Sequence, residues 1–159
     1  MKEIKNLLIH APNWLGDIVM SLPAIHLIKE EYKDIKITVL AKKSMFGILT
    51  VSGLVDDVIE LKTFPALKKY HFDAALLFPN SFESAFRVFA HGIKRRIGYR
   101  ADYRSFMLTE AVERESVRWW HTADYYVNLL KAIDINKPRP VIKLNIKEDI
   151  LNNAKDYIK

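Results

Sequence analysis

The sequence predicts an α/β fold, a Rossmann-like domain in which a parallel sheet is flanked by helices. Three observations predict it: short apolar runs alternate with segments of helical periodicity, several of these runs are rich in β-branched residues, and Pro, Asn or Gly occurs in the connections. Strands that alternate with helices are typical of a parallel sheet covered on both faces. A chain of 159 residues is long enough for one such domain and too short for two full-sized ones.

The elements follow in order along the chain. Apolar, β-branched runs predict strands over residues 4–10, 35–41, 57–61, 73–78, 96–99 and 141–144. Helical spacing predicts helices over residues 17–32, 45–51, 81–91, 119–133 and 148–159, with a helical turn over 65–70. Pro23 should bend the first helix or mark its first full turn. Ser81 should cap the helix that Gly92 ends.

Composition limits the partners of the chain. The formal net charge is +6 and the sequence pI is about 9.4, so we expect attraction to anions such as nucleic acid, phosphorylated sugars or an anionic leaflet. There is no cysteine, which agrees with a reducing cytoplasm. No apolar run reaches the ~20 residues that span a bilayer, so we expect a soluble protein that is at most bound to a membrane surface.

The loop after the first strand carries the most informative local pattern, Asn13-Trp14-Leu15-Gly16-Asp17. It lacks the G-x-G-x-x-G pattern of dinucleotide sites, so we expect no such cofactor here. Residue preference favours Asp17 as a helix cap. The alternative is a carboxylate that faces a crevice and takes a proton from an attacking hydroxyl.

Three segments resemble the ADP-heptose:lipopolysaccharide heptosyltransferases, glycosyltransferase family 9, and in particular the heptosyltransferase II group. The first is residues 13–23 (NWLGDIVMSLP). The second comprises residues 77–85 (LFPNSFESA), 90–93 (AHGI) and 96–99 (RIGY), and the weaker third is residues 121–126 (HTADYY). They occur in the family's order and approximate spacing, over essentially the whole chain.

This resemblance implies one half of a GT-B enzyme, in which two Rossmann-like domains face each other across a cleft. Residues 1–140 would form the N-terminal, acceptor-binding domain and residues 141–159 the start of the connection to a donor-binding domain that the sequence lacks. The implied reaction is an inverting, metal-independent transfer of heptose from ADP-heptose to the lipopolysaccharide inner core, with Asp17 as the base. By itself the fragment should be inactive, and the surface left uncovered should favour a homodimer.

Basic residues crowd into positions 87–104, and the implied acceptor carries carboxylates and phosphates that arginine can grip. The predicted acceptor contacts are Asn13, Trp14, Gly16, Lys42, Lys43, Asn80, Ser81, Arg96, Arg100 and Arg104. For Ser81, capping remains the simpler role. Phe82, Phe86 and Phe89 have the spacing of a core stripe rather than a lipid groove. Histidines such as His10 and His26 lack partners at metal-binding spacing, so we assign no metal.

Two functions therefore remain open. The preferred one is the acceptor half of a cytoplasmic heptosyltransferase, which would bind peripherally to the inner face of the inner membrane. The other is a non-catalytic basic module that binds nucleic acid or acidic lipid through the arginine cluster. The common nucleic-acid signatures are missing from the sequence, so we expect no nucleic-acid partner.

Overall fold

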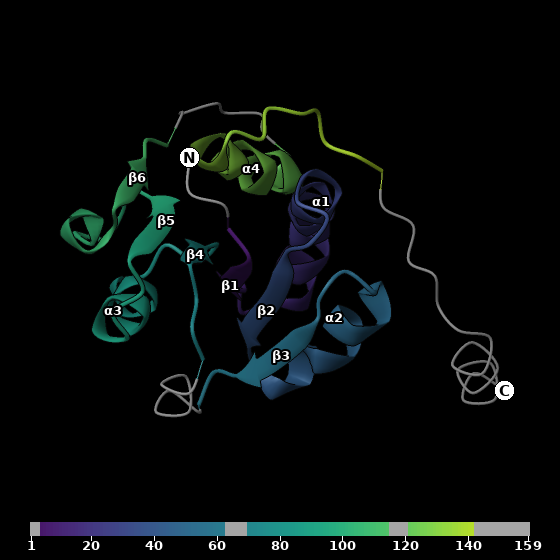
Figure 1. Cartoon of the computed structure of the whole chain (residues 1–159), viewed down its shortest axis with the longest axis horizontal. Helices are drawn as coiled ribbons and strands as arrows, with labels where there is room; N and C mark the ends of the chain where they lie inside the picture. The colour runs from purple at the N-terminus through teal and green to yellow at the C-terminus, as the bar shows by residue number, and fades with distance from the viewer. Residues whose placement is uncertain (1–3, 63–69, 115–120, 142–159) are drawn as a thin grey trace, which may run out of the picture.

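The structure is a computed structural model that describes residues 4–62, 70–114 and 121–141. Its centre is a six-stranded sheet in the order β3-β2-β1-β4-β5-β6, and every neighbouring pair is parallel (Figure 1). This topology confirms the predicted fold class, a Rossmann-like sheet flanked by helices.

The elements have the following bounds. The strands are β1 (Asn6–His10), β2 (Lys36–Ala41), β3 (Asp57–Glu60), β4 (Ala74–Leu77), β5 (Arg95–Tyr99) and β6 (Glu110–Val112). The α-helices are α1 (Leu15–Glu31), α2 (Phe46–Ser52), α3 (Phe82–Ala90) and α4 (Thr122–Asn128). The described ranges also contain three 3₁₀ helices: η1 (Lys43–Met45), η3 (Ser105–Met107) and η4 (Leu129–Ile133).

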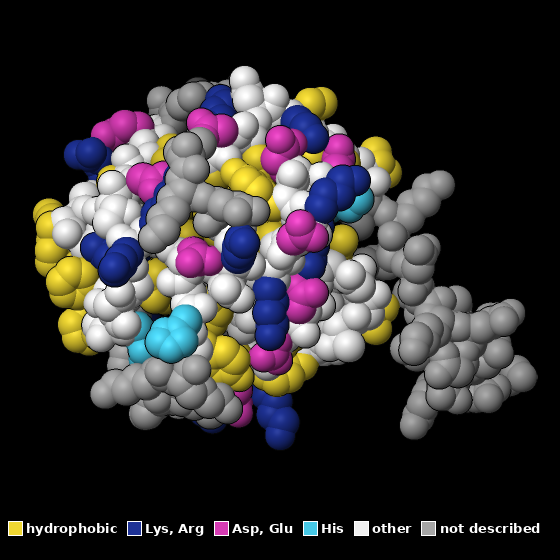
Figure 2. Space-filling view, in the orientation of Figure 1, with side chains coloured by type: hydrophobic (Ala, Val, Ile, Leu, Met, Phe, Trp, Pro, Cys, Tyr) yellow, Lys and Arg dark blue, Asp and Glu magenta, His cyan; other side chains and the backbone are white. Residues whose placement is uncertain are grey.

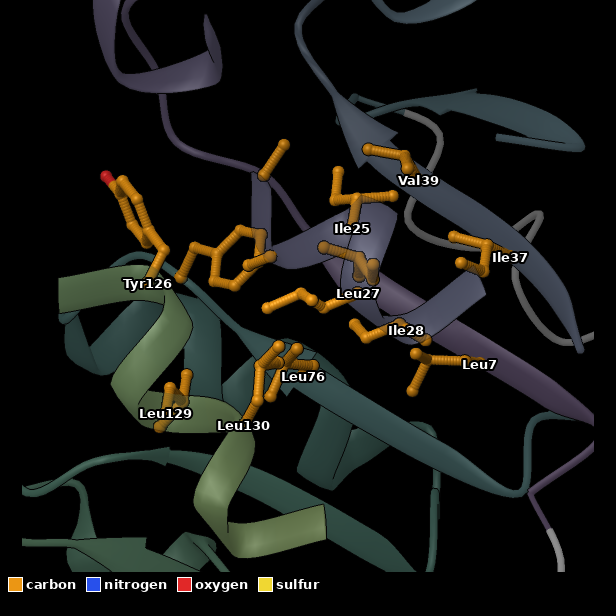
Figure 3. Packing of buried hydrophobic residues seen from close by; sticks show 14 of the residues in the cluster. Leu7, Ile25, Leu27, Ile28, Ile37, Val39, Leu76, Tyr126, Leu129 and Leu130 are labelled. Carbon is orange, nitrogen blue, oxygen red and sulfur yellow. The ribbon is translucent and has the colours of Figure 1, made fainter. Parts of the chain in front are cut away.

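Helices cover the two faces of the sheet unequally. From β1 the chain moves toward β3, whereas from β4 it moves the opposite way toward β6, so right-handed connections place α1 and α3 on opposite faces. The larger core lies under α1, α2 and α4, where Ile25 and Ile28 of α1 belong to the same cluster of buried residues as Leu7 of β1 and Leu130 of η4 (Figure 3). The smaller core lies on the other face, under α3.

The structure corrects the prediction for α3. Its buried residues are Ser84, Ala85 and Val88, and the three phenylalanines predicted to form a core stripe are 44 to 49% exposed. Both sides of α3 are apolar enough to pack, and the small side chains form the side that lies on the sheet. The capping prediction is confirmed, since the Ser81 hydroxyl oxygen accepts a hydrogen bond from the Ser84 N–H.

Other predictions differ in detail. The helix predicted over residues 17–32 begins two residues earlier and continues through Pro23 without a break. In the described part of the predicted 119–133 helix, α4 changes into η4 and ends at Asp134, whose φ is 61°. The short edge strand β6 was not predicted. The predicted helix over 148–159, most of the turn over 65–70 and of the strand over 141–144, and Trp119 and Trp120 lie outside the described residues.

Candidate functional site

The candidate site lies at the carboxyl-terminal edge of the sheet, between β1 and β4. The strand order reverses between these two neighbours, and in open α/β sheets ligands bind in the crevice at such a point. The loop after β1 leads to Asp17 and the loop after β4 contains Asn80. The topology therefore brings together two predicted site residues that are 63 positions apart in the sequence.

Asp17 lies in the first turn of α1 and its side chain is partly exposed. Trp14 occupies the N-cap position, so the interpretation of Asp17 as the cap is wrong. The positive end of the helix dipole favours a negative charge at this place. A Cβ atom built on Gly16 would meet no described atom within 4 Å, which leaves the backbone beside Asp17 open to a ligand.

Trp14 and Lys42 lie close together at the same edge of the sheet. The Trp14 side chain is 74% exposed, and the Lys42 ammonium lies 5.8 Å from the centre of its ring. Asn13 and Lys43 are exposed as well. An exposed indole and two lysines offer a flat apolar surface and positive charge to a substrate that carries both sugar rings and anionic groups.

Tyrosines of α4 connect the two loops of the site. The Asn80 amide nitrogen donates a 2.6 Å hydrogen bond to the Tyr125 hydroxyl oxygen. The neighbouring Tyr126 packs on Phe78, with ring centroids 4.9 Å apart. Burial raises the pKa of Tyr126, and the negative charge of Asp17 raises it further, so the phenol remains protonated beside the carboxylate.

Tyr99, at the end of β5, packs against α4. Its ring stacks on that of Tyr125 at 4.3 Å, and its hydroxyl donates to the Tyr125 carbonyl oxygen. The site residues predicted from sequence did not include Tyr99, Tyr125 or Tyr126. The signal was available in part, because Tyr125 and Tyr126 belong to the third segment that resembles the family.

Arg104 corrects the predicted set of acceptor contacts, because its side chain is wholly buried. Its guanidinium donates to the carbonyl oxygens of Tyr99 and Pro79, to the Ser84 hydroxyl and to the Asn80 amide oxygen. Burial lowers the pKa of Arg104 to about 10, so its guanidinium remains charged at neutral pH. Arg104 therefore holds the loop after β4 in place and is not an acceptor contact.

Arg96 and Arg100 lie at opposite ends of β5. Arg96 is at the amino-terminal end, remote from Asp17, and donates to the carbonyl oxygens of Ile93 and Met107. The structure therefore does not bring Arg96 together with Asp17. Arg100 follows β5 at the site edge, is exposed, and pairs with Glu113 at 2.8 Å.

The basic residues at positions 87–104 are thus divided among the interior and two edges of the sheet. The alternative function, a basic module that binds nucleic acid or acidic lipid, depended on the density of charge at these positions in the sequence. In the described residues this charge does not form one surface.

A cavity of about 410 Å³ lies at the amino-terminal edge, away from Asp17. Its lining includes His71, Asp73, His91 and Lys94. In the ranges that the structure describes, no three or more His, Asp or Glu side chains form a group able to hold a metal ion. A search of the same ranges finds no helix with the length and apolar character needed to cross a bilayer.

Comparisons with known proteins agree with the family that the resembling segments indicate. The sequence model of glycosyltransferase family 9 (heptosyltransferase) matches residues 61–159, more than half of the chain. Lipopolysaccharide heptosyltransferase 2 of Escherichia coli K12 is 26% identical over 136 residues, which are 77% of this chain and 39% of that protein. The chain thus spans about two fifths of that curated relative.

Solved structures share the fold. The E. coli ADP-heptose lipopolysaccharide heptosyltransferase II superposes with a TM-score of 0.84 at 23% identity, over 97% of this chain and 50% of that one. An E. coli heptosyltransferase bound to ADP-2-deoxy-2-fluoro heptose gives a TM-score of 0.75 at 17% identity, over 93% and 54% of the two chains. Together with the family match, the parallel sheet and its edge loops place this protein in glycosyltransferase family 9, the heptosyltransferases.

Proposed function

We propose that this chain forms the acceptor-binding half of an inverting glycosyltransferase that moves heptose from ADP-heptose to the lipopolysaccharide inner core. The observation that carries the proposal is the partly exposed carboxylate of Asp17 at the strand-order reversal, opposite the loop that holds Asn80. Relatives named as heptosyltransferases, one of them solved with an ADP-heptose analogue, supply the reaction class. The proposed place of action is the cytoplasmic side of the inner membrane.

In this mechanism Asp17 is the general base. The acceptor hydroxyl oxygen forms a bond to the anomeric carbon, while the bond from that carbon to the diphosphate oxygen breaks and ADP leaves with the electron pair. The hydroxyl proton passes to the Asp17 carboxylate. A carboxylate is a weak base, so its contribution depends on its position in the first turn of α1.

The acceptor would contact the residues that the structure places at the same edge. Trp14 and Lys42 lie together on one side, Asn80 and Ser81 on the other, and Arg100 follows β5. Asn13, Gly16 and Lys43 complete the proposed set. Residues 1–140 are proposed as the acceptor domain, and residues 141–159 as the start of the connection to a domain that holds the donor.

The proposal is tested by adding a donor-binding domain from a relative. This chain is fused to, or co-expressed with, the C-terminal half of a curated heptosyltransferase 2, and ADP release is measured with a heptose-accepting core oligosaccharide. Loss of a general base typically lowers the rate by about 10²–10⁴, so we expect Asp17→Asn to lower kcat/KM by about that factor. Asp34→Asn changes an exposed aspartate in the turn after α1 and is the matched control. Turnover of Asp17→Asn at the rate of the unmutated fusion would refute the assignment.

A further inference from the structure

Four phenylalanines form a continuous exposed surface beside the site, here called the aromatic face: Phe82, Phe86 and Phe89 on α3, and Phe106 in η3. The rings of Phe82 and Phe86 stack with centroids 6.4 Å apart, and Phe106 lies 6.3 Å from Phe82. Phe106 is 71% exposed. In Figure 2 hydrophobic side chains line the left edge of the molecule, where Figure 1 places α3.

Single exposed phenylalanines are common, but a contiguous group is typical of an interaction surface. Here the group is not needed to cover the sheet, because Ser84, Ala85 and Val88 on the other side of α3 do so. The four side chains expose a large apolar area to water, which is unfavourable. A binding partner that covered this area would lower the free energy.

Positive charge borders the aromatic face. The Arg96 guanidinium lies 5.3 Å from the centre of the Phe89 ring, and Lys94, two residues earlier, is exposed. Within α3, Glu83 pairs with Arg87, so its negative charge is compensated. Apolar rings flanked by Lys and Arg match the boundary between acyl chains and anionic headgroups of a bilayer.

The aromatic face begins at the same edge of the sheet as the candidate site. α3 begins directly after Asn80 and Ser81, so Phe82 lies at the site edge and the stripe runs from there toward Phe89. A bilayer in contact with this surface would present a membrane-anchored acceptor next to Asp17.

We propose that the aromatic face docks on an anionic lipid bilayer, with the phenylalanine rings in the interfacial region and with Lys94 and Arg96 at the lipid phosphates. The benefit to catalysis rests on the proposed function, whereas the binding itself does not. A second copy of the chain fits less well, because pairing two such faces would bring their basic borders together.

The test measures co-sedimentation of the chain with vesicles of phosphatidylcholine that contain phosphatidylglycerol. Exposed phenylalanines each contribute to partitioning, so we expect the double variant Phe86→Ser/Phe89→Ser to weaken binding about tenfold or more. Val141→Ser, which changes a side chain that is 87% exposed, is the control and should bind as the unmutated chain does. Circular dichroism and thermal unfolding verify that each variant is folded.

Charge is tested separately. Lys94→Gln should weaken binding to the anionic vesicles, and the exposed Lys33→Gln should have a smaller effect. Pure phosphatidylcholine and high salt should both reduce binding. Unchanged binding of the phenylalanine double variant would overturn the proposal, and so would self-association without lipid that this variant abolishes.

The two proposals fail in different ways. Turnover of a delipidated acceptor that depends on Asp17, without vesicle binding, would overturn the docking surface alone. Vesicle binding that depends on the phenylalanines, with an Asp17→Asn fusion of normal activity, would overturn the catalytic assignment alone.

Discussion

Asn80 and Tyr125 are 45 residues apart and are joined by a 2.6 Å hydrogen bond from the Asn80 amide to the Tyr125 hydroxyl. This contact ties the loop after β4 to α4, the helix that also places Tyr126 near Asp17. The two loops of the proposed site therefore share one support.

Tyr125→Phe keeps the ring that stacks on Tyr99 and removes only the hydroxyl. We expect the free energy of unfolding to fall by about 1 kcal/mol, the usual value for one hydrogen bond. If Asn80 contacts the acceptor, the fusion enzyme should also show a raised acceptor KM. Urea unfolding and steady-state kinetics measure the two effects. The control is Tyr103→Phe, because Tyr103 is 95% exposed, and an equal loss in both variants would contradict the prediction.

Arg104→Met should lower stability strongly. The variant removes a buried guanidinium and leaves the carbonyl oxygens of Pro79 and Tyr99 without this donor. We expect a loss of about 3 kcal/mol or more, measured by urea unfolding. Arg100→Met is the matched control: its ion pair with Glu113 is exposed and should be worth less than about 1 kcal/mol. Similar losses for the two variants would show that Arg104 does not hold the loop.

Gly98→Ala should be destabilising because of the same guanidinium. A Cβ at this position would lie 3.0 Å from the Arg104 Nη2 atom and 3.3 Å from the Leu77 Cβ atom. The several hydrogen bonds of Arg104 oppose its displacement, so we expect a loss of about 1–3 kcal/mol by thermal unfolding.

Gly47→Ala provides the comparison for this substitution. Gly47 lies in α2, and its added Cβ would meet no described atom within 4 Å. Because alanine favours helix over glycine, this variant should gain up to about 1 kcal/mol. A neutral Gly98→Ala variant would mean that β5 has more space than the structure shows.

His10 should make stability depend on pH. The side chain is buried at the end of β1, and desolvation lowers its pKa from 6.5 to about 4. Between these values the unfolded chain binds a proton that the folded chain does not, so stability is full above pH 6.5 and falls as the pH drops toward 4. From pH 7 to pH 5 the loss due to His10 should be about 2 kcal/mol.

Urea unfolding at both pH values measures this loss, and His10→Gln should largely remove it. His71→Gln, at an exposed histidine, should leave the pH dependence unchanged. Equal pH dependence in the unmutated chain and in His10→Gln would assign the effect to other groups.

The local sequence was sufficient for much of this protein. Apolar runs and helical spacing predicted β1 to β5, the helices α1 to α3 and the Ser81 cap, because these depend on residues close together in the chain. The motif around Asp17 indicated the family and the edge of the sheet where the candidate site lies. The strand β6 was missed, since its three partly exposed residues bury too little to leave an apolar pattern.

Tertiary structure alone decided which side chains reach the site and which side of α3 packs. Arg96, Arg100 and Arg104 are close in sequence, yet β5 separates the first two and the third turns inward because Gly98 leaves room for it. The phenylalanine spacing identified an apolar stripe, but periodicity cannot say whether another layer covers it. Here the smaller side chains of α3 pack on the sheet, and the aromatic rings face outward.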